Sequence, residues 1–417
     1  MTEKKILIAN NFYYNRGGAS TYVFDLSGLL NMHGNKVIPF SMHHPMNFKT
    51  VYSKYFISHI DYAEEIKRIS PISTLKVGLR CIFSLEANKK IENLIRREKP
   101  DIAHIQSIHH HITPSILYVL KKFRIPIIWT LHDFVLICPN TNFFYNDQVC
   151  EKCKYVKYFW APLCKCKKNS FFASFAAAVE TTVHRMMRIF NYVDIFISPS
   201  EFLRKKFIEF GYPSERIVHL PNPMDPIVNE LNYVDSGYCL YAGRLAQGKG
   251  LKTLIDATIQ AGKVNLKIVG NGPLMKELVS YVKSKDNKGL IKMLGQKSRN
   301  EVIELLKRSN FSVVPSELYE NFPYSVLEAF AIGKPVIGSR IGGIPELIDD
   351  GINGFLFPPK DVARLSELMC TLSENHDRAR RMGENAKKKC ALKFNSKKHY
   401  NELMKIYQQA AGSKFIL

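Results

Sequence analysis

Both halves of the chain repeat one order of elements, and this order restricts the fold more than any other feature. The first half opens with a short apolar run, Ile6 to Ala9. It continues with the loop Arg16-Gly17-Gly18, a helical stretch from Ser20 to Asn31 and a second apolar run, Val37 to Phe40. A strand, a glycine loop, a helix and a strand in this order predict a βαβ unit and a parallel sheet.

A proline-rich segment separates this series from a second one. Three of the six residues from Pro221 to Pro226 are prolines, which is typical of a linker. Further buried strands are expected at residues 100–105, 125–130, 195–198, 239–242, 266–269, 311–314, 335–338 and 355–357. The predicted fold class is α/β, with two doubly wound, Rossmann-like domains that face a central cleft, where such sheets bind ligands.

Length and charge agree with two domains and an anionic ligand. The 417 residues suffice for two domains of about 200 residues each. The net charge is +22, of which +13 lies in residues 1–222 and +9 in the remainder. A charge spread in this way suits phosphorylated ligands or an anionic membrane surface better than nucleic acid, and no recognisable nucleic-acid-binding module occurs.

The N-terminus and the apolar runs indicate the compartment. Residues 1–5 are polar and lead directly into a strand, so no signal peptide is expected. The apolar run from Phe171 to Val179 has nine residues, far fewer than the ~20 that span a bilayer. We therefore expect a cytoplasmic protein that can rest on the inner face of a membrane.

Two carboxylates flank a predicted helix start in the second half. Glu320 lies in the loop before the helix expected from Tyr324 to Ile332, and Glu328 lies about one turn inside it. Backbone N–H groups at a helix start have no helical partner and can hold an anion. Here these groups belong to Tyr324, Ser325 and Val326. The pattern favours a site for a phosphorylated, hydroxyl-rich ligand over two solvated surface glutamates.

Two cations follow another strand of the second half. Arg244 and Lys249 lie after the strand at 239–242, in a loop with three glycines that let the backbone approach a ligand closely. Cations at the carboxyl end of a strand can bind a diphosphate and stabilise the charge that it gains when it leaves.

The first half offers a histidine and a glycine pair in comparable places. His132 ends the buried strand that starts at Ile125, and Asp133 is a candidate to orient it. Gly17 and Gly18 fit a loop that lets ligands approach, although the pair is not the Gly-x-Gly-x-x-Gly of a dinucleotide-binding loop.

Together these motifs resemble a known family. The region from Tyr241 to Pro358 is similar to the C-terminal domain of retaining GT-B fold glycosyltransferases of the group 1, family 4 type. The matching pieces are Ala242-Gly243-Arg244-Leu245 with Lys249-Gly250, Val269-Gly270-Asn271-Gly272-Pro273, Pro315-Ser316 with Glu320 and Glu328, and Gly342-Gly343-Ile344-Pro345-Glu346. A weaker similarity covers the first half through Arg16-Gly17-Gly18 and Leu131-His132-Asp133.

The resemblance implies a role for each candidate residue. Arg244 and Lys249 would bind the donor diphosphate, together with the amides of residues 324–326. Glu320 would contact the transferred sugar near the reacting carbon, and His132 would hydrogen-bond that sugar. Glu328 would accept hydrogen bonds from the donor ribose. The other donor-binding residues would be Gly17, Gly18, Gly272 and Gln296, the last of them beside the base. Asn321 departs from the glycine that many members have.

The resemblance also implies the reaction. A sugar would pass with retention from a nucleotide-diphosphate sugar to a glycan or lipid-linked acceptor in bacterial-type surface polysaccharide synthesis, which is hexosyltransferase chemistry (EC 2.4). No Asp-x-Asp pair occurs to hold a divalent cation on the donor, so no catalytic metal is expected. Two alternatives stay open: a nucleotide-sugar 2-epimerase on a similar fold, and a non-catalytic, zinc-bearing scaffold at a membrane surface.

The implied domain organisation has three parts. Residues 1–222 would form an N-terminal Rossmann-like acceptor domain with a Cys-rich insertion at 138–166. Residues 223–395 would form a C-terminal Rossmann-like nucleotide-sugar domain. Residues 396–417 would form a helix that packs back on the N-terminal domain.

The insertion contains a candidate metal site. Cys150 and Cys153 form a C-x2-C motif, Cys164 and Cys166 form a C-x-C motif, and Cys138 precedes them. Four of these five thiolates could hold a structural zinc that stabilises a polar segment with little core. Reduced thiols, a disulfide and an iron–sulfur cluster are the alternatives.

Overall fold

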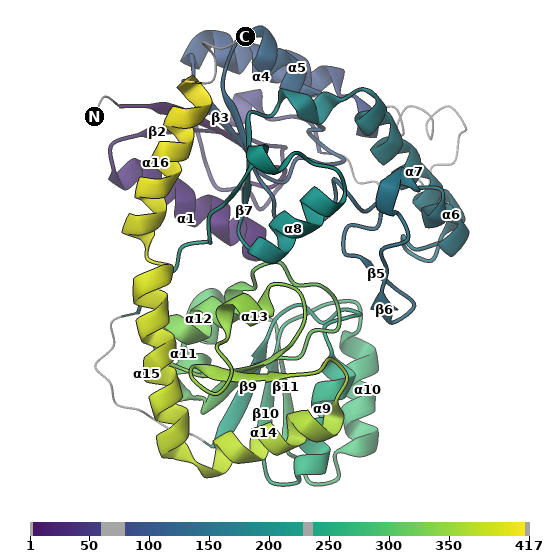
Figure 1. Ribbon diagram of the computed structural model, residues 1–417, viewed down its shortest axis with the longest axis vertical. Helices are drawn as coiled ribbons and strands as arrows, with labels where there is room; N and C mark the ends of the chain where they lie inside the picture. The colour runs from purple at the N-terminus through teal and green to yellow at the C-terminus, as the bar shows by residue number, and fades with distance from the viewer. Residues whose placement is uncertain (1–2, 60–79, 228–236, 413–417) are drawn as a thin grey trace.

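The computed structural model describes residues 3–59, 80–227 and 237–412. The chain forms two lobes, drawn one above the other in Figure 1, and each lobe contains a six-stranded sheet with helices packed against it. Every strand pair in both sheets is parallel. The predicted fold class, two Rossmann-like α/β units, is confirmed.

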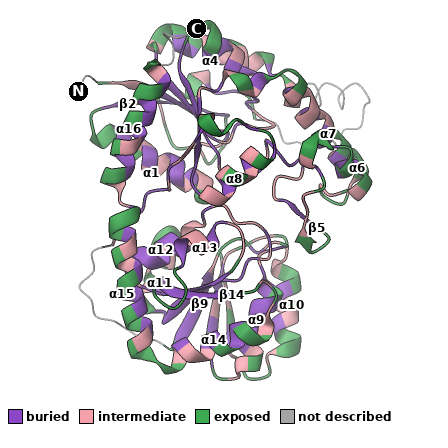
Figure 2. Cartoon of the chain, in the orientation of Figure 1, coloured by how far each residue is buried: buried purple, intermediate pink, exposed green. Residues whose placement is uncertain are grey.

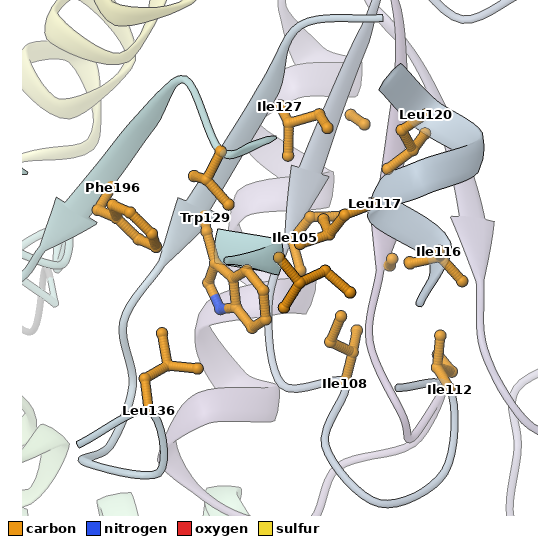
Figure 3. Packing of buried hydrophobic residues seen from close by; sticks show 14 of the residues in the cluster. Ile105, Ile108, Ile112, Ile116, Leu117, Leu120, Ile127, Trp129, Leu136 and Phe196 are labelled. Carbon is orange, nitrogen blue, oxygen red and sulfur yellow. The ribbon is translucent and has the colours of Figure 1, made fainter. Parts of the chain in front are cut away.

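The first sheet has the strand order β2-β1-β3-β4-β7-β8. Its strands are β1 (Lys5–Ala9), β2 (Lys36–Phe40), β3 (Ile102–Ile105), β4 (Ile127–Thr130), β7 (Ile195–Ser198) and β8 (Ile217–His219). Successive side chains of a strand point to opposite faces, so Leu7 and Ala9 pack in one core, while Ile6 and Ile8 pack in the other. Figure 3 shows the first of these cores around Trp129.

The helices of the first lobe follow the predicted alternation. They are α1 (Gly18–Met32), α4 (Leu85–Glu98), α5 (Ile116–Lys122), α6 (Trp160–Cys164), α7 (Phe171–Met186) and α8 (Glu201–Glu209). The side chain of Ser200 accepts a hydrogen bond from the Leu203 amide at 3.1 Å and so caps α8. The segment between β4 and β7 carries α6, α7 and the antiparallel hairpin of β5 (Phe144–Tyr145) and β6 (Gln148–Val149).

The second sheet has the order β11-β10-β9-β12-β13-β14. Its strands are β9 (Tyr238–Ala242), β10 (Asn265–Val269), β11 (Ile291–Gly295), β12 (Phe311–Val314), β13 (Val336–Ser339) and β14 (Gly354–Phe357). The helices are α9 (Leu251–Ala261), α10 (Met275–Lys285), α11 (Arg299–Arg308), α12 (Tyr324–Ile332), α13 (Ile344–Leu347), α14 (Val362–Glu374) and α15 (His376–Lys393). In both lobes the buried residues, purple in Figure 2, lie along the strands.

The last helix, α16 (Ser396–Gly412), returns to the first lobe. Leu403 and Tyr407 are fully buried there in the same core as Ile6 and Ile8. The linker and the start of α16 run side by side. The Met224 amide donates to the Phe394 carbonyl oxygen at 2.6 Å, and the Ser396 amide donates to Asp225 Oδ1 at 2.8 Å. The chain therefore crosses between the lobes twice at one place.

Candidate functional site

The predicted site residues follow the carboxyl ends of strands in both sheets. In each sheet the order of strands reverses at one point, between β1 and β3 in the first and between β9 and β12 in the second. Ligands of doubly wound sheets bind outside the strand ends at such a point. Gly17 and Gly18 follow β1, Arg244 and Lys249 follow β9, and Glu320 follows β12. The topology therefore gathers them at the reversal points.

A cation and a carboxylate meet at the reversal point of the second sheet. Lys249 Nζ lies 2.5 Å from Glu320 Oε1, and the Ser316 hydroxyl donates to the same oxygen at 2.5 Å. Both charged side chains are largely buried: the side chain of Lys249 is 27% exposed and that of Glu320 is 14% exposed. A partly dehydrated ion pair is held firmly, so its charges stand in fixed positions.

Close packing of two loops brings this pair together. A Cβ at Gly250 would lie 1.7 Å from the Pro315 carbonyl oxygen, and the glycine has a φ of +67°. Only glycine fits there. The amides of Glu317 and Leu318 both donate to the Gly248 carbonyl oxygen, at 2.7 and 3.1 Å. The loop after β9 is therefore bonded directly to the loop that carries Glu320.

The start of α12 faces the glycine pair of the other lobe. A Cβ at Gly18 would lie 3.3 Å from the ring of Tyr324, so the glycine allows this close approach. Helix α12 begins at Tyr324, as predicted, and its first amides belong to Tyr324, Ser325 and Val326. The Tyr324 hydroxyl is buried and has no hydrogen-bond partner among the described residues.

Glu328 lies in an ion-pair cluster that spans the two lobes. Arg299 on α11 contacts Glu328 Oε1 through Nε at 3.5 Å and Asp25 Oδ1 through Nη1 at 3.4 Å. Burial raises the pKa of both carboxyls, and the Arg299 cation between them opposes the shift. This pairing could not be predicted from local patterns, because Asp25 and Arg299 are 274 residues apart in the chain.

His132 is oriented by a residue other than the one expected. Its Nε2 lies 2.6 Å from Gln106 Oε1, whereas Asp133 accepts a hydrogen bond from the Val135 amide at 2.9 Å. The suggestion that Asp133 orients His132 is therefore wrong. Gln106 directly follows the buried strand β3, and a polar residue in that position is the signal that could have identified it. Burial lowers the pKa of His132 to about 4, so the imidazole is neutral near pH 7.

Three other predicted residues lie on the same edge of the second sheet. Arg244 is exposed just after β9, and Gln296 is exposed just after β11. Gly272 follows β10 and packs against the loop of Arg244, since a Cβ there would lie 2.3 Å from the Leu245 carbonyl oxygen. These residues share the sheet edge with Lys249.

Two side chains of the second lobe bond to the first. Asn321 accepts from the Ser200 hydroxyl at 2.8 Å and donates through Nδ2 to the Leu131 carbonyl oxygen at 3.1 Å. The Glu346 carboxylate accepts from the Glu201 and Phe202 amides at the start of α8, at 2.8 and 2.6 Å. Asn321 thus connects the Glu320 loop to the residue before His132.

Replacing Asn321 by Ala should destabilise the contact between the lobes. The change leaves the Leu131 carbonyl and the Ser200 hydroxyl without these partners, which typically costs about 1–3 kcal/mol when such groups are buried. Urea-induced unfolding measures the loss of free energy. Asn300→Ala, at an exposed position of α11, is the matched control and should stay within about 0.5 kcal/mol of the parent. If Asn321→Ala and Asn300→Ala lost the same unfolding free energy, the hydrogen bonds of Asn321 would not stabilise the contact between the lobes.

The five cysteines of the insertion gather around Cys153. Burial is the main cause that raises the pKa of the Cys153 thiol. The neighbouring thiols of Cys138, Cys166, Cys150 and Cys164 raise this pKa further. Each of the five is a free thiol. Within residues 3–59, 80–227 and 237–412, no group of three or more His, Cys, Asp or Glu side chains is arranged to hold a metal ion. The structural zinc stays a prediction.

None of the helices in the described part of the chain combines the length and the apolar character that a bilayer crossing requires.

Comparisons with known proteins agree with the sheet topology and the motifs. The model of the family described as Glycosyltransferase Family 4 matches residues 16–227. A second model, described as Glycosyl transferases group 1, matches residues 227–389.

Individual relatives match between about half and all of the chain. An uncharacterized glycosyltransferase of Methanocaldococcus jannaschii is 25% identical over 409 residues, which is 97% of this chain and 98% of the relative. The amylovoran biosynthesis glycosyltransferase AmsK of Erwinia amylovora is 27% identical over 54% of this chain and 58% of its own length. The crystal structure of Anabaena HepE with UDP-glucose has a TM-score of 0.64 at 19% identity and covers 100% of both chains, which shows a shared fold.

Proposed function

The chain belongs to glycosyltransferase family 4, and from this premise we propose that it is a retaining hexosyltransferase. It moves a sugar from a nucleotide-diphosphate sugar to a glycan or lipid-linked acceptor in surface polysaccharide synthesis. Glycosyl transfer follows from the family, whereas the donor, the stereochemistry and the acceptor are parts of the proposal. The AmsK relative, which carries amylovoran biosynthesis in its name, supports the polysaccharide assignment.

One observation carries the proposal: the Lys249–Glu320 pair at the reversal point of the second sheet. A fixed cation beside a fixed carboxylate suits a substrate that joins a diphosphate to a sugar. Lys249 and Arg244 bind the diphosphate, Glu320 contacts the sugar, and Glu328 accepts from the ribose. The UDP-glucose bound to the HepE neighbour supports a uridine nucleotide as the donor class.

The proposed reaction exchanges two bonds at the anomeric carbon. The bond to the diphosphate oxygen breaks, and a bond to the acceptor oxygen forms on the same face of the sugar. The acceptor proton passes to the leaving phosphate. Fixed cations stabilise the charge that the diphosphate gains, which is the usual role of preorganised groups in such a step. Without an Asp-x-Asp pair in the sequence, Arg244 and Lys249 supply this charge in a metal-independent reaction.

We place the protein in the cytoplasm, peripheral at the inner face of the membrane, where a lipid-linked acceptor is accessible. The net charge of +22 supports attraction to an anionic surface.

Thermal unfolding with a panel of nucleotides tests the donor. UDP and its sugar conjugates should raise the Tm, whereas GDP and ADP should not, because a ligand stabilises the native state that binds it. The shift should persist in EDTA, disappear in Arg244→Ala and survive in Lys252→Ala, an exposed cation on α9. No shift with any nucleotide would favour the scaffold alternative. Turnover of the nucleotide sugar without an acceptor would favour the epimerase.

A further inference from the structure

Exposed apolar side chains are concentrated in one short segment of the first lobe. Among the described residues, 18 large hydrophobic side chains are exposed, and ten of them fall between residues 155 and 187. We call this group the α6–α7 surface; it consists of Tyr155, Val156, Phe159, Trp160, Leu163, Phe171, Phe172, Phe175, Met186 and Met187. A cluster of this kind on a protein surface marks an interaction site more often than chance exposure does.

Helix α7 presents this surface because its two faces differ. Its inner face is made of small side chains, including Ser174, Ala177 and Ala178, all buried. Its outer face carries Phe172, which is 81% exposed, and Phe175, which is 51% exposed. An aromatic outer face contributes little to the core of the lobe. The outer face of α7 therefore presents apolar area on which a partner could pack.

Helix α6 extends the same surface. It packs on α7, and its residues Trp160 and Leu163 are also exposed. The rings of Phe159 and Trp160 lie 5.4 Å apart, so the aromatic residues of this part are grouped. Both helices lie at the outer margin of the upper lobe, where Figure 2 shows exposed residues along them.

Cations are interspersed with these aromatic residues. From Lys152 to Val179 the chain has six lysines and no aspartate or glutamate. Lys152, Lys157, Lys165 and Lys168 are exposed. The next acidic residue, Glu180, is buried and lies 2.9 Å from His110 Nδ1, so its charge is not displayed on the surface. The α6–α7 surface is thus apolar and aromatic, with four exposed lysines interspersed along its sequence.

We infer that the α6–α7 surface docks on an anionic phospholipid leaflet. Aromatic side chains settle at the headgroup level of a bilayer, and each lysine near an anionic surface adds about 1 kcal/mol of attraction. Lysine is depleted in the core of protein–protein interfaces, which disfavours a protein partner here. The inference rests on the proposed function, since it assigns a surface to the membrane association proposed above.

The loop between α6 and α7 contacts the edge of the first sheet, where His132 also lies. Lys167, in the loop between α6 and α7, has its Nζ 3.4 Å from His110 Nε2. His110 follows β3, and its ring Nδ1 contacts Glu180 on α7. A leaflet bound to this surface would therefore lie next to the strand ends where a lipid-linked acceptor must enter.

Vesicle sedimentation of the full chain tests the inference. The probes are phosphatidylcholine vesicles with and without phosphatidylglycerol, mixed with protein in the absence of donor and acceptor. The parent should bind the anionic vesicles, and Phe172→Glu with Phe175→Glu should bind at least about ten-fold more weakly, because two apolar contacts are lost. Leu392→Glu, 71% exposed on α15 of the other lobe, is the matched control and should bind as the parent does.

Three results would overturn the inference. The parent could fail to bind anionic vesicles, or the double variant could bind as tightly as the control. Gel filtration could also show that the parent is a dimer and the double variant a monomer, while the double variant still binds vesicles. In that case a second copy of the chain covers the surface. The UDP-induced Tm shift, measured on the same variants, checks that they are folded. It also separates a failure of docking from a failure of the donor assignment.

Discussion

Lys249→Ala is expected to lower kcat/KM for the nucleotide-sugar donor by about 10²–10³-fold, the usual loss when one preorganised electrostatic group is removed. The physical reason is the position of the ammonium group, which lies 2.5 Å from Glu320 at the strand ends of the second sheet. A diphosphate leaving from this place gains charge in the transition state, and a cation already in position needs no reorganisation. Initial rates at several donor concentrations give the value.

The neighbouring Lys252 provides the control for this experiment. It lies three residues later, is exposed on α9 and pairs with Glu277 at 2.7 Å. Lys252→Ala removes the same charge and side chain outside the proposed site, so its kcat/KM should stay within about two-fold of the parent. Equal losses in both variants would show that net charge, rather than the fixed position of Lys249, matters. A fully active Lys249→Ala would reject the role of Lys249.

Ending the chain after Phe394 is expected to abolish folding of the first lobe. The deleted helix α16 buries side chains against the first sheet, among them Leu403, Met404, Ile406 and Tyr407. Each is worth roughly 1.5–3 kcal/mol when buried, so the sum reaches the 5–15 kcal/mol that stabilises a typical protein. The truncated chain should be insoluble or lack a cooperative thermal transition.

Point variants of α16 test the same contact without a truncation. The Tyr407 hydroxyl lies 2.8 Å from His104 Nδ1, and the Thr130 hydroxyl lies 2.7 Å from His104 Nε2, all of them buried. Tyr407→Phe should cost about 1–3 kcal/mol of unfolding free energy, because His104 loses a buried partner. Leu403→Ala should cost about 2–5 kcal/mol. Gln408→Ala, exposed on the same helix, should be neutral, and a soluble, cooperatively folding truncation would refute the prediction.

The sequence was sufficient for elements with strong local signals. Helix α12 begins and ends at the predicted residues, since Pro323 precedes its first turn and Gly333 adopts the left-handed conformation that ends it. Strands β8 and β11 were missed. Both are edge strands with partly exposed side chains, and Lys292 interrupts the apolar run of β11. Edge strands lack the continuous apolar pattern on which such predictions rely.

For the site, the sequence indicated most side chains but not their partners. Lys249 and Glu320 were both recognised from their places after strands, and the structure brings them together. Gln106, Arg299 and the bridging role of Asn321 were not foreseen. Their contacts join residues from different lobes or strands, and only the tertiary structure determines such pairs. The error over Asp133 has the same origin, because proximity in sequence did not predict the hydrogen bond.

The return of α16 to the first lobe has a consequence for synthesis. The ribosome makes residues 5–219, which supply every strand of the first sheet, before any of α16. The face of that sheet with Ile6 and Ile8, on which Tyr22 of α1 also packs, therefore lacks the helix α16 until residues 396–412 have been made. The second lobe is translated in the interval and can fold as a unit, since domains usually do so during synthesis. The domain that begins first is thus completed last.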